Sequence, residues 1–155
     1  MRLAEALARR ADVQTRVQQL RARIEASARH QEGEEPAEDA GALLAEAGEA
    51  LTELQGLIRR INATNAATPL EGGRTITDGI AERDVLKLRH SLLSAAANAA
   101  AGSSSRSFRQ LRSELREIAA LPVADVRRQA DDVARRLREL DTLIQQRNWE
   151  VELLD

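Results

Sequence analysis

A repeat near the C-terminus constrains the fold of this sequence more than any other feature. Between residues 123 and 151, mostly apolar side chains recur at alternating intervals of three and four residues. These positions are Val123, Val126, Ala130, Val133, Leu137, Leu140, Ile144, Arg147 and Val151. Side chains with this spacing form one stripe along an α-helix, here called a seam, which packs against other helices. The repeat therefore predicts a long helix within a mainly α-helical protein.

The N-terminal stretch has a seam of the same kind. It consists of Leu3, Ala6, Arg10, Val13, Val17, Leu20, Ile24 and Ser27. It predicts a helix over about residues 2–30, and the C-terminal seam predicts a helix over about residues 123–151. Arg10 and Arg147 are charged residues inside the two seams. We expect polar pairing by these arginines to fix the register of the packed helices.

Two further helices are predicted between these, over about residues 38–62 and 77–101. The seam of the first holds Leu44, Ala47, Leu51, Leu54, Ile58 and Ile61, broadened by Leu43 and Leu57. The seam of the second holds Ala81, Val85, Leu88, Leu92, Ala95 and Ala99. Short connections place consecutive helices antiparallel to each other. Asn62 marks the expected end of the earlier helix, because asparagine tolerates the backbone conformation of helix termini.

Helical periodicity fails first over residues 68–76, where Pro69 and the pair Gly72 and Gly73 interrupt it. A small β-hairpin fits this stretch. Residues 106–121 fit either a helix or a strand. We therefore expect a single domain, residues 1–155, that is mainly α, with long antiparallel helices, coiled-coil-like heptad seams and a small β-hairpin.

Composition bears on assembly and location. The chain has one Phe, one Trp and no Tyr, so its apolar content is almost entirely aliphatic, which suits close helix packing. We expect an elongated homo-oligomer that completes its core by self-association. The net charge of −2 argues against nucleic acid or a membrane as the main partner. The absence of cysteine excludes disulfides and thiolate sites, and no long apolar run is present, so a cytoplasmic protein is expected.

Four arginines, Arg2, Arg9, Arg16 and Arg23, recur every seven residues beside the N-terminal seam. They could form a basic ridge that follows phosphates. They could also cover the edge of the seam and pair with acidic residues of a neighbouring helix. We favour pairing, because no aromatic residues lie between the arginines and acidic residues dilute their charge.

Polar residues gather near the expected helix ends, where binding sites are often found. Residues 31–57 contain eight carboxylates and no basic residue, which would suit a divalent metal or would equally favour the start of the next helix. The candidate ligand-binding residues are Gln31, Glu32, Glu34, Asn62, Asn65, Glu82, Arg83, Asp84, Asn148 and Trp149. Trp149 would supply a stacking face. Inter-helix ion pairing is the alternative for Glu82, Arg83 and Asp84.

No catalytic motif is present. The sequence lacks GxxxxGK[ST], GxGxxG after a strand and GxSxG, and neither His30 nor His90 has a second histidine at metal-ligand spacing. No catalytic residue is therefore predicted, and the cofactor expectation is limited to a divalent metal.

Five segments taken together resemble a known family. They read MRLAEAL at Met1 to Leu7, QEGEEPAED at Gln31 to Asp39, INATN at Ile61 to Asn65, IAERDVL at Ile80 to Leu86, and LDTLIQQRNW at Leu140 to Trp149. In this order they resemble the small bacterial proteins of unestablished function that are often labelled septicolysin. The resemblance implies a helical, coiled-coil-rich fold that assembles into oligomers, with a strand near residues 113–118. It does not imply pore formation, because no segment offers lipid an apolar band.

Three functions follow from these features. The first is an oligomeric structural or protein-interaction module without catalysis. The second is a ligand- or metal-binding protein whose site is formed by the polar helix ends. The third is weak nucleic-acid binding by the arginine ridge.

Overall fold

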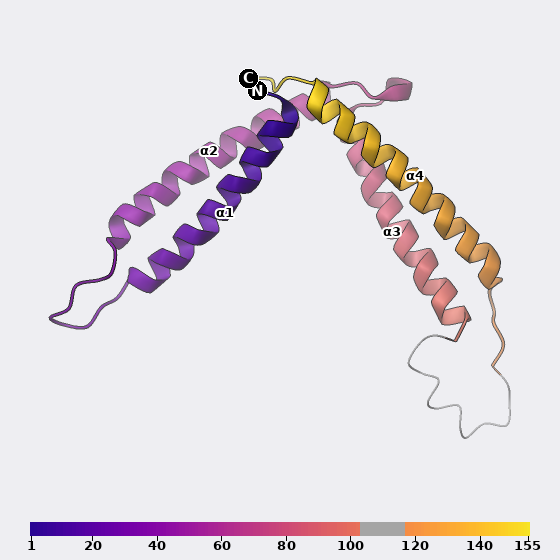
Figure 1. Cartoon of the computed structure of the whole chain (residues 1–155), viewed down its shortest axis with the longest axis horizontal. Coiled ribbons are helices and arrows are strands. Elements are labelled where there is room, and N and C mark those ends of the chain that lie inside the picture. Colours follow the sequence, from indigo (N-terminus) through magenta and orange to yellow (C-terminus); the bar gives the residue numbers. More distant parts are fainter. Residues whose placement is uncertain (103–116) are drawn as a thin grey trace. The chain divides into compact units, whose positions relative to one another are not determined.

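The structure, a computed structural model, describes residues 1–102 and 117–155 of the chain. Its helices are α1 (Leu3–Ser27), α2 (Ala40–Ala67), α3 (Ile76–Ala100) and α4 (Val123–Glu150), with a short 3-10 turn, η1 (Glu71–Gly73), before α3 (Figure 1). The mainly α prediction is confirmed. The chain divides into two compact units, which we describe separately. Unit 1 comprises residues 1–69 and 145–155, and unit 2 comprises residues 70–144.

In unit 1, α1 and α2 form an antiparallel hairpin (Figure 1). The predicted α1 seam is the buried face, with Leu3, Ala6, Val13, Leu20 and Ser27 all buried. The side chain of Glu5 accepts a hydrogen bond of 2.7 Å from the backbone N–H of Arg2, which satisfies a free donor at the start of the helix. The start of α2 is capped in the same sense by Asp39, whose carboxylate accepts from the N–H groups of Gly41 and Ala42.

The predicted seam of α2 is partly wrong. The buried side chains are Leu43, Ala47, Ala50, Leu57, Ile61 and Thr64. Leu44, Leu51 and Ile58 are instead exposed, to 63%, 51% and 38%. The contact face is therefore rotated toward Leu43 and Leu57, which broaden the predicted seam.

The expected end of α2 at Asn62 is also wrong, because the helix continues to Ala67. Thr64 and Thr68 are buried beyond that point, and each donates its hydroxyl proton to the carbonyl four residues earlier. Burial of this last turn outweighs the tendency of asparagine to end a helix.

Residues 151–155 close unit 1 at the other end of the hairpin. The N–H of Leu3 donates to the carbonyl of Val151, and the N–H of Leu153 donates to the carbonyl of Met1, both at 2.9 Å. The N–H of Leu154 donates to the hydroxyl of Thr64 at 3.0 Å. The C-terminal tail thereby holds the start of α1 and the end of α2 together.

The β-hairpin expected at residues 68–76 is wrong, and the described residues contain no strand in this stretch. The N–H of Leu70 donates to the carbonyl of Arg74 at 2.7 Å, closing a tight turn around η1. Gly72 and Gly73 both have positive φ angles, 74° and 75°, a backbone conformation that glycine adopts readily. Most of the strand expected near residues 113–118, and most of the ambiguous stretch 106–121, lies outside the described residues.

In unit 2, α3 and α4 run antiparallel (Figure 1). The predicted seam of α4 is confirmed as the buried face, since every seam position is buried or half-buried. The predicted seam of α3 is wrong, because Val85, Leu88 and Leu92 are 63%, 72% and 70% exposed. The buried positions of α3 are instead Ile76, Gly79, Leu86 and Ala97.

Gly79 shows how closely the buried face of α3 packs. A Cβ atom at this position would lie 2.5 Å from Cδ1 of Leu70 and 3.5 Å from Cδ1 of Ile144. Both neighbours are buried, so glycine permits an approach that a larger residue would prevent.

Candidate interaction surface

Helix α3 presents a row of apolar side chains to solvent. This row, here called the α3 stripe, consists of Ala81, Val85, Leu88, Leu92, Ala95 and Ala99. Their spacing of three and four places all of them on one helical face. An ordered row of large exposed aliphatic residues typically marks a surface that another protein covers.

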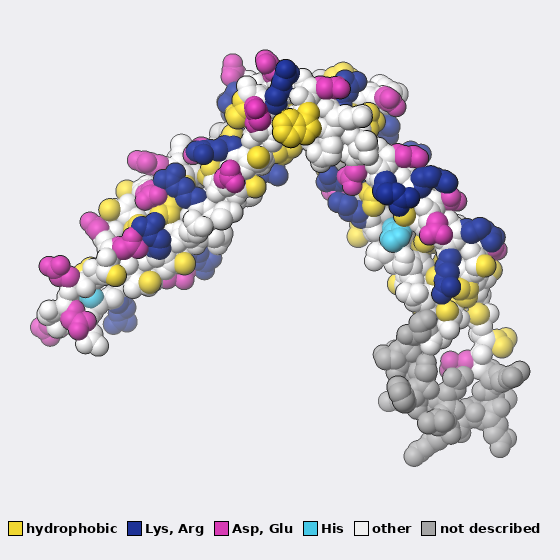
Figure 2. Space-filling model, in the orientation of Figure 1, with side chains coloured by type: hydrophobic (Ala, Val, Ile, Leu, Met, Phe, Trp, Pro, Cys, Tyr) yellow, Lys and Arg dark blue, Asp and Glu magenta, His cyan; other side chains and the backbone are white. Residues whose placement is uncertain are grey.

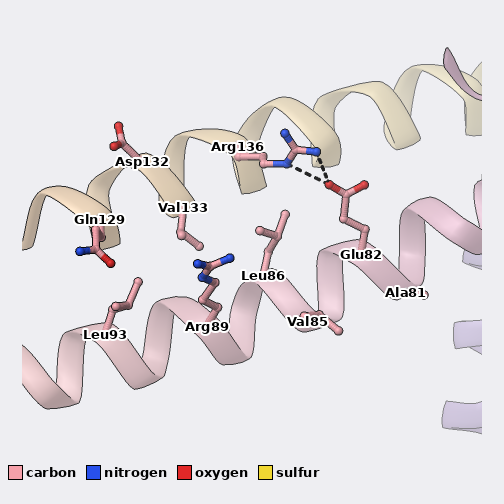
Figure 3. Close-up of a pocket in the computed structure, with 10 residues that line it drawn as sticks. All are labelled: Ala81, Glu82, Val85, Leu86, Arg89, Leu93, Gln129, Asp132, Val133 and Arg136. Atoms are coloured by element: carbon pink, nitrogen blue, oxygen red, sulfur yellow. Dashed lines mark hydrogen bonds and ion pairs between the residues drawn. The ribbon is translucent and has the colours of Figure 1, made fainter. Parts of the chain in front are cut away.

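A groove of about 760 Å³ lies beside the α3 stripe, between α3 and α4 (Figure 3). Its apolar walls include Val85, Leu86 and Leu93 of α3 and Val133 of α4. Val85 belongs to both the groove and the α3 stripe. The two features therefore form one continuous apolar surface.

An ion-pair cluster lies at one end of the groove. Glu82 accepts hydrogen bonds from Nε of Arg136 at 2.9 Å and from its Nη2 at 2.6 Å, joining α3 to α4 (Figure 3). Arg74 also pairs with Glu82. The hydrogen bonds from Arg136 lower the pKa of Glu82 despite the opposing effect of burial. Glu82 is thus held as a carboxylate that links the two helices.

The neighbouring charges have different surroundings. Arg83 pairs with Asp84 at 3.2 Å and lies 3.9 Å from a carboxylate oxygen of Asp141 on α4. Ion pairing, the alternative to a ligand site, therefore describes Glu82 and Arg83. Lys87 and Arg89 have no ion-pair partner among residues 1–102 and 117–155, and Arg89 extends from α3 into the groove (Figure 3).

The other predicted site residues belong to unit 1. Gln31, Glu32 and Glu34 are exposed in the connection between α1 and α2. Asn62 is exposed and Asn65 half-buried near the far end of α2, where a rise of 1.5 Å per residue places Asn62 about 33 Å from the start of the helix. The loop carboxylates and these amides therefore lie at opposite ends of the hairpin.

The last two candidates are adjacent on α4. Asn148 is buried, with 4% of its surface exposed, whereas Trp149 is 63% exposed. In the part of the chain that the structure describes, no group of three or more His, Cys, Asp or Glu residues could hold a metal ion. The ligand-site hypothesis stays a prediction.

The arginine ridge is paired with acidic residues. Arg9 lies 2.6 Å from Glu53, Arg16 lies 2.8 Å from Glu46, and Arg23 pairs with Glu38. The favoured interpretation, pairing with acidic residues of a neighbouring helix, is therefore confirmed for Arg9 and Arg16, whereas the partner of Arg23 lies just before α2. On the face drawn in Figure 2, basic and acidic side chains are interspersed along the helices. The ridge is not a free basic surface for phosphates.

Among residues 1–102 and 117–155, the seam arginines make no comparable contact across helices. Nε of Arg10 is buried without a hydrogen-bond partner, and Arg147 pairs with Glu150 of its own helix at 2.9 Å. The inter-helix ion pairs of the hairpin are made by the flanking arginines instead.

Sequence reasoning missed the exposure of the α3 stripe. The stripe was assigned to the core because it is purely apolar, whereas the true contact face contains the half-buried Arg83 and His90. The available clue was that Leu86, Leu93 and Ala97 form a second apolar row on the same helix.

None of the helices within the described residues is long and apolar enough to cross a membrane. A search of curated proteins finds no match. The chain is similar to a functionally unknown conserved protein from Corynebacterium diphtheriae, known from its crystal structure, with 38% identity and a TM-score of 0.91. The alignment covers 99% of each chain. Residues 10–153 match DUF6847, a family of unknown function. The chain therefore belongs to the DUF6847 family.

Proposed function

We propose that this protein is a structural or protein-interaction module that self-associates through exposed helix faces and has no catalytic activity. The observation that carries the proposal is the exposure of Val85, Leu88 and Leu92, to 63%, 72% and 70%. Full burial of an aliphatic side chain of this size contributes about 1.5–3 kcal/mol. Covering the α3 stripe would therefore favour association.

A second exposed row supports assembly. Leu44, Leu51 and Ile58 recur every seven residues on α2 and remain exposed. We call them the α2 stripe. Leu51 also lines a shallow groove of about 620 Å³ along α1 and α2, together with Val17 and Leu54. The septicolysin resemblance, which implies oligomers, and the heptad spacing of both stripes point to coiled-coil-like contacts between chains.

The lowered pKa values of three carboxylates favour a structural role. Carboxylates that act as general acids typically have a raised pKa. Here the pKa of Glu38 is lowered by a hydrogen bond from Arg23, that of Asp78 by the backbone N–H of Thr75, and that of Glu82 by Arg136. In each case the hydrogen bond that lowers the pKa also stabilises an ion pair or a helix start.

Native mass spectrometry and sedimentation velocity over a wide range of protein concentration test the proposal. We expect species at a clean multiple of the 17.0 kDa chain mass. A protein that stays monomeric at every concentration would contradict self-association. A reproducible extra mass for each subunit would instead support the ligand-binding alternative.

A further inference from the structure

We propose that a second copy of this chain covers the α3 stripe, with the two α3 helices antiparallel about a twofold axis between residues 86 and 87. This inference rests on the self-association proposed above and specifies its contact. Three observations carry it: the arrangement of apolar residues, the arrangement of charges, and the unpaired state of two cations.

Four of the six residues of the α3 stripe are arranged symmetrically about this axis. In an antiparallel pair, residues equally distant from the axis lie opposite each other. Val85 would then lie opposite Leu88 of the second copy, and Ala81 opposite Leu92. The contact between Ala81 and Leu92 sets a small side chain against a large one, which allows close packing of two helices. Each of these two contacts occurs twice because of the twofold symmetry.

The charges beside the stripe are antisymmetric about nearly the same point. Glu82 and Asp84 precede it, whereas Lys87 and Arg89 follow it. An antiparallel pair brings the acidic pair of each copy close to the basic pair of the other. A parallel pair in register would set like charges beside each other, which is unfavourable.

Three of the four charges that would meet the second copy are available, whereas Glu82 is already bound by Arg136 and Arg74 of its own chain. Lys87 and Arg89 have no ion-pair partner within the described parts of the chain, and Asp84 pairs only with its neighbour Arg83, its side chain being 59% exposed. A partner carrying only acidic or only basic groups could pair with just one of the two sets of charges. A second copy matches both sets.

The first experiment compares Leu88→Glu with Leu51→Glu by sedimentation velocity. Both leucines are largely exposed, to 72% and 51%, so each substitution removes little packing within the chain, and circular dichroism should show unchanged folding. Leu88→Glu places two carboxylates in the apolar contact and should weaken association by about a hundredfold. Leu51→Glu, on the α2 stripe, should leave this contact intact.

The outcomes separate this inference from the proposed function. A monomeric wild-type protein would overturn both. A wild-type oligomer that Leu88→Glu does not weaken would leave self-association standing and overturn the α3 contact. Loss of association with Leu51→Glu alone would assign the interface to the α2 stripe and equally overturn the inference.

Charge exchange tests the pairing of Asp84 with Lys87. Asp84→Lys and Lys87→Asp should each weaken association, because each sets like charges beside each other in the pair. The double variant should restore it, because the exchange preserves complementarity. Additive weakening in the double variant would contradict the predicted charge contact.

The helix direction can be measured directly, because the chain contains no cysteine and a single introduced cysteine takes a spin label uniquely. Asn98 is exposed and lies outside the α3 stripe. In the antiparallel pair, labels at Asn98→Cys would be separated by about 35 Å along the helix axis. A parallel pair in register would leave no separation along the helix axis, and that much shorter distance would overturn the inference.

Discussion

The hydroxyl of Thr64 accepts a hydrogen bond of 3.0 Å from the backbone N–H of Leu154, 90 residues later in the chain. The same hydroxyl donates to the carbonyl of Arg60 at 2.8 Å, so one fully buried side chain serves both α2 and the C-terminal tail. Nε of Arg60 reinforces the junction by donating to the carbonyl of Leu154 at 2.8 Å.

Thr64→Val should lower the free energy of unfolding by about 1–3 kcal/mol, because it preserves side-chain shape but leaves the N–H of Leu154 without its acceptor. Urea denaturation measures this change. Thr52 is a matched control, since it is exposed and its hydroxyl bonds only to the carbonyl of Gly48. Thr52→Val should change stability by less than about 0.5 kcal/mol. Equal effects of the two variants would show that the link to Leu154 contributes nothing.

The ion pair between Arg16 and Glu46 should show a favourable coupling energy, below about 1 kcal/mol, in a double-mutant cycle. Both side chains are partly exposed, so added salt should reduce the coupling. Arg21 and Glu25, four residues apart within α1, provide a comparison pair that does not connect two helices. A coupling of zero at low salt for Arg16 and Glu46 would mean that the arginine ridge does not hold α1 against α2.

Glu82 should make stability depend on pH. Its pKa in the folded protein lies below its ordinary value, so the carboxylate contributes stability above that value and loses it as the pH falls through the folded pKa. Glu82→Gln should therefore destabilise the protein at pH 7 by about 0.5–1 kcal/mol. The difference from wild type should shrink as the pH falls below 4.5, the ordinary value for this group.

Denaturation at neutral and acidic pH measures this difference. Glu139, an exposed residue of α4 without an ion pair among the described residues, provides the control variant Glu139→Gln. At neutral pH this variant should change stability by less than about 0.5 kcal/mol. A constant difference for Glu82→Gln would contradict the ionic link from α3 to α4.

Two glycines should respond to substitution with opposite signs. Gly79→Val should destabilise the protein by about 1–3 kcal/mol, because the new side chain meets the buried Leu70 and Ile144. Gly48→Ala should stabilise it by about 0.5–1 kcal/mol, because nothing lies within 4 Å of the new Cβ and alanine favours the helix. Thermal melts measure both changes, and a destabilising Gly48→Ala would show that this helix face is covered.

Sequence periodicity predicted the contact faces of α1 and α4 because each has one strongly apolar row. On α4 every predicted seam position, from Val123 to Val151, is at least half-buried. Aliphatic seams of this kind leave no competing face for burial.

The same reasoning failed on α3, which has two apolar rows. The buried row contains Arg83, whose charge is offset by ion pairs that a sequence does not show, and the purely apolar row containing Leu88 stays exposed. Periodicity alone cannot rank two such rows. The α3 stripe, and with it the candidate interaction surface, therefore required three-dimensional information.

The residue types predicted that helical structure is interrupted at Gly72 and Gly73, but not which structure takes its place. Glycines suit a hairpin turn and a 3-10 turn alike, and here residues 71–73 form the 3-10 turn η1, which the bond from the N–H of Leu70 to the carbonyl of Arg74 closes. The capping of α3 by Thr75 and Asp78 then restores helical geometry directly after it.

Unit 1 is assembled from both ends of the chain, because residues 145–155 join residues 1–69. During synthesis, α1 and α2 therefore leave the ribosome long before the tail, which accepts a hydrogen bond from Leu3 and donates one to Thr64. The hairpin can form early, but its junction lacks these bonds until residues 151–155 have been synthesised. Unit 1 is therefore completed only after the whole of unit 2 has been translated.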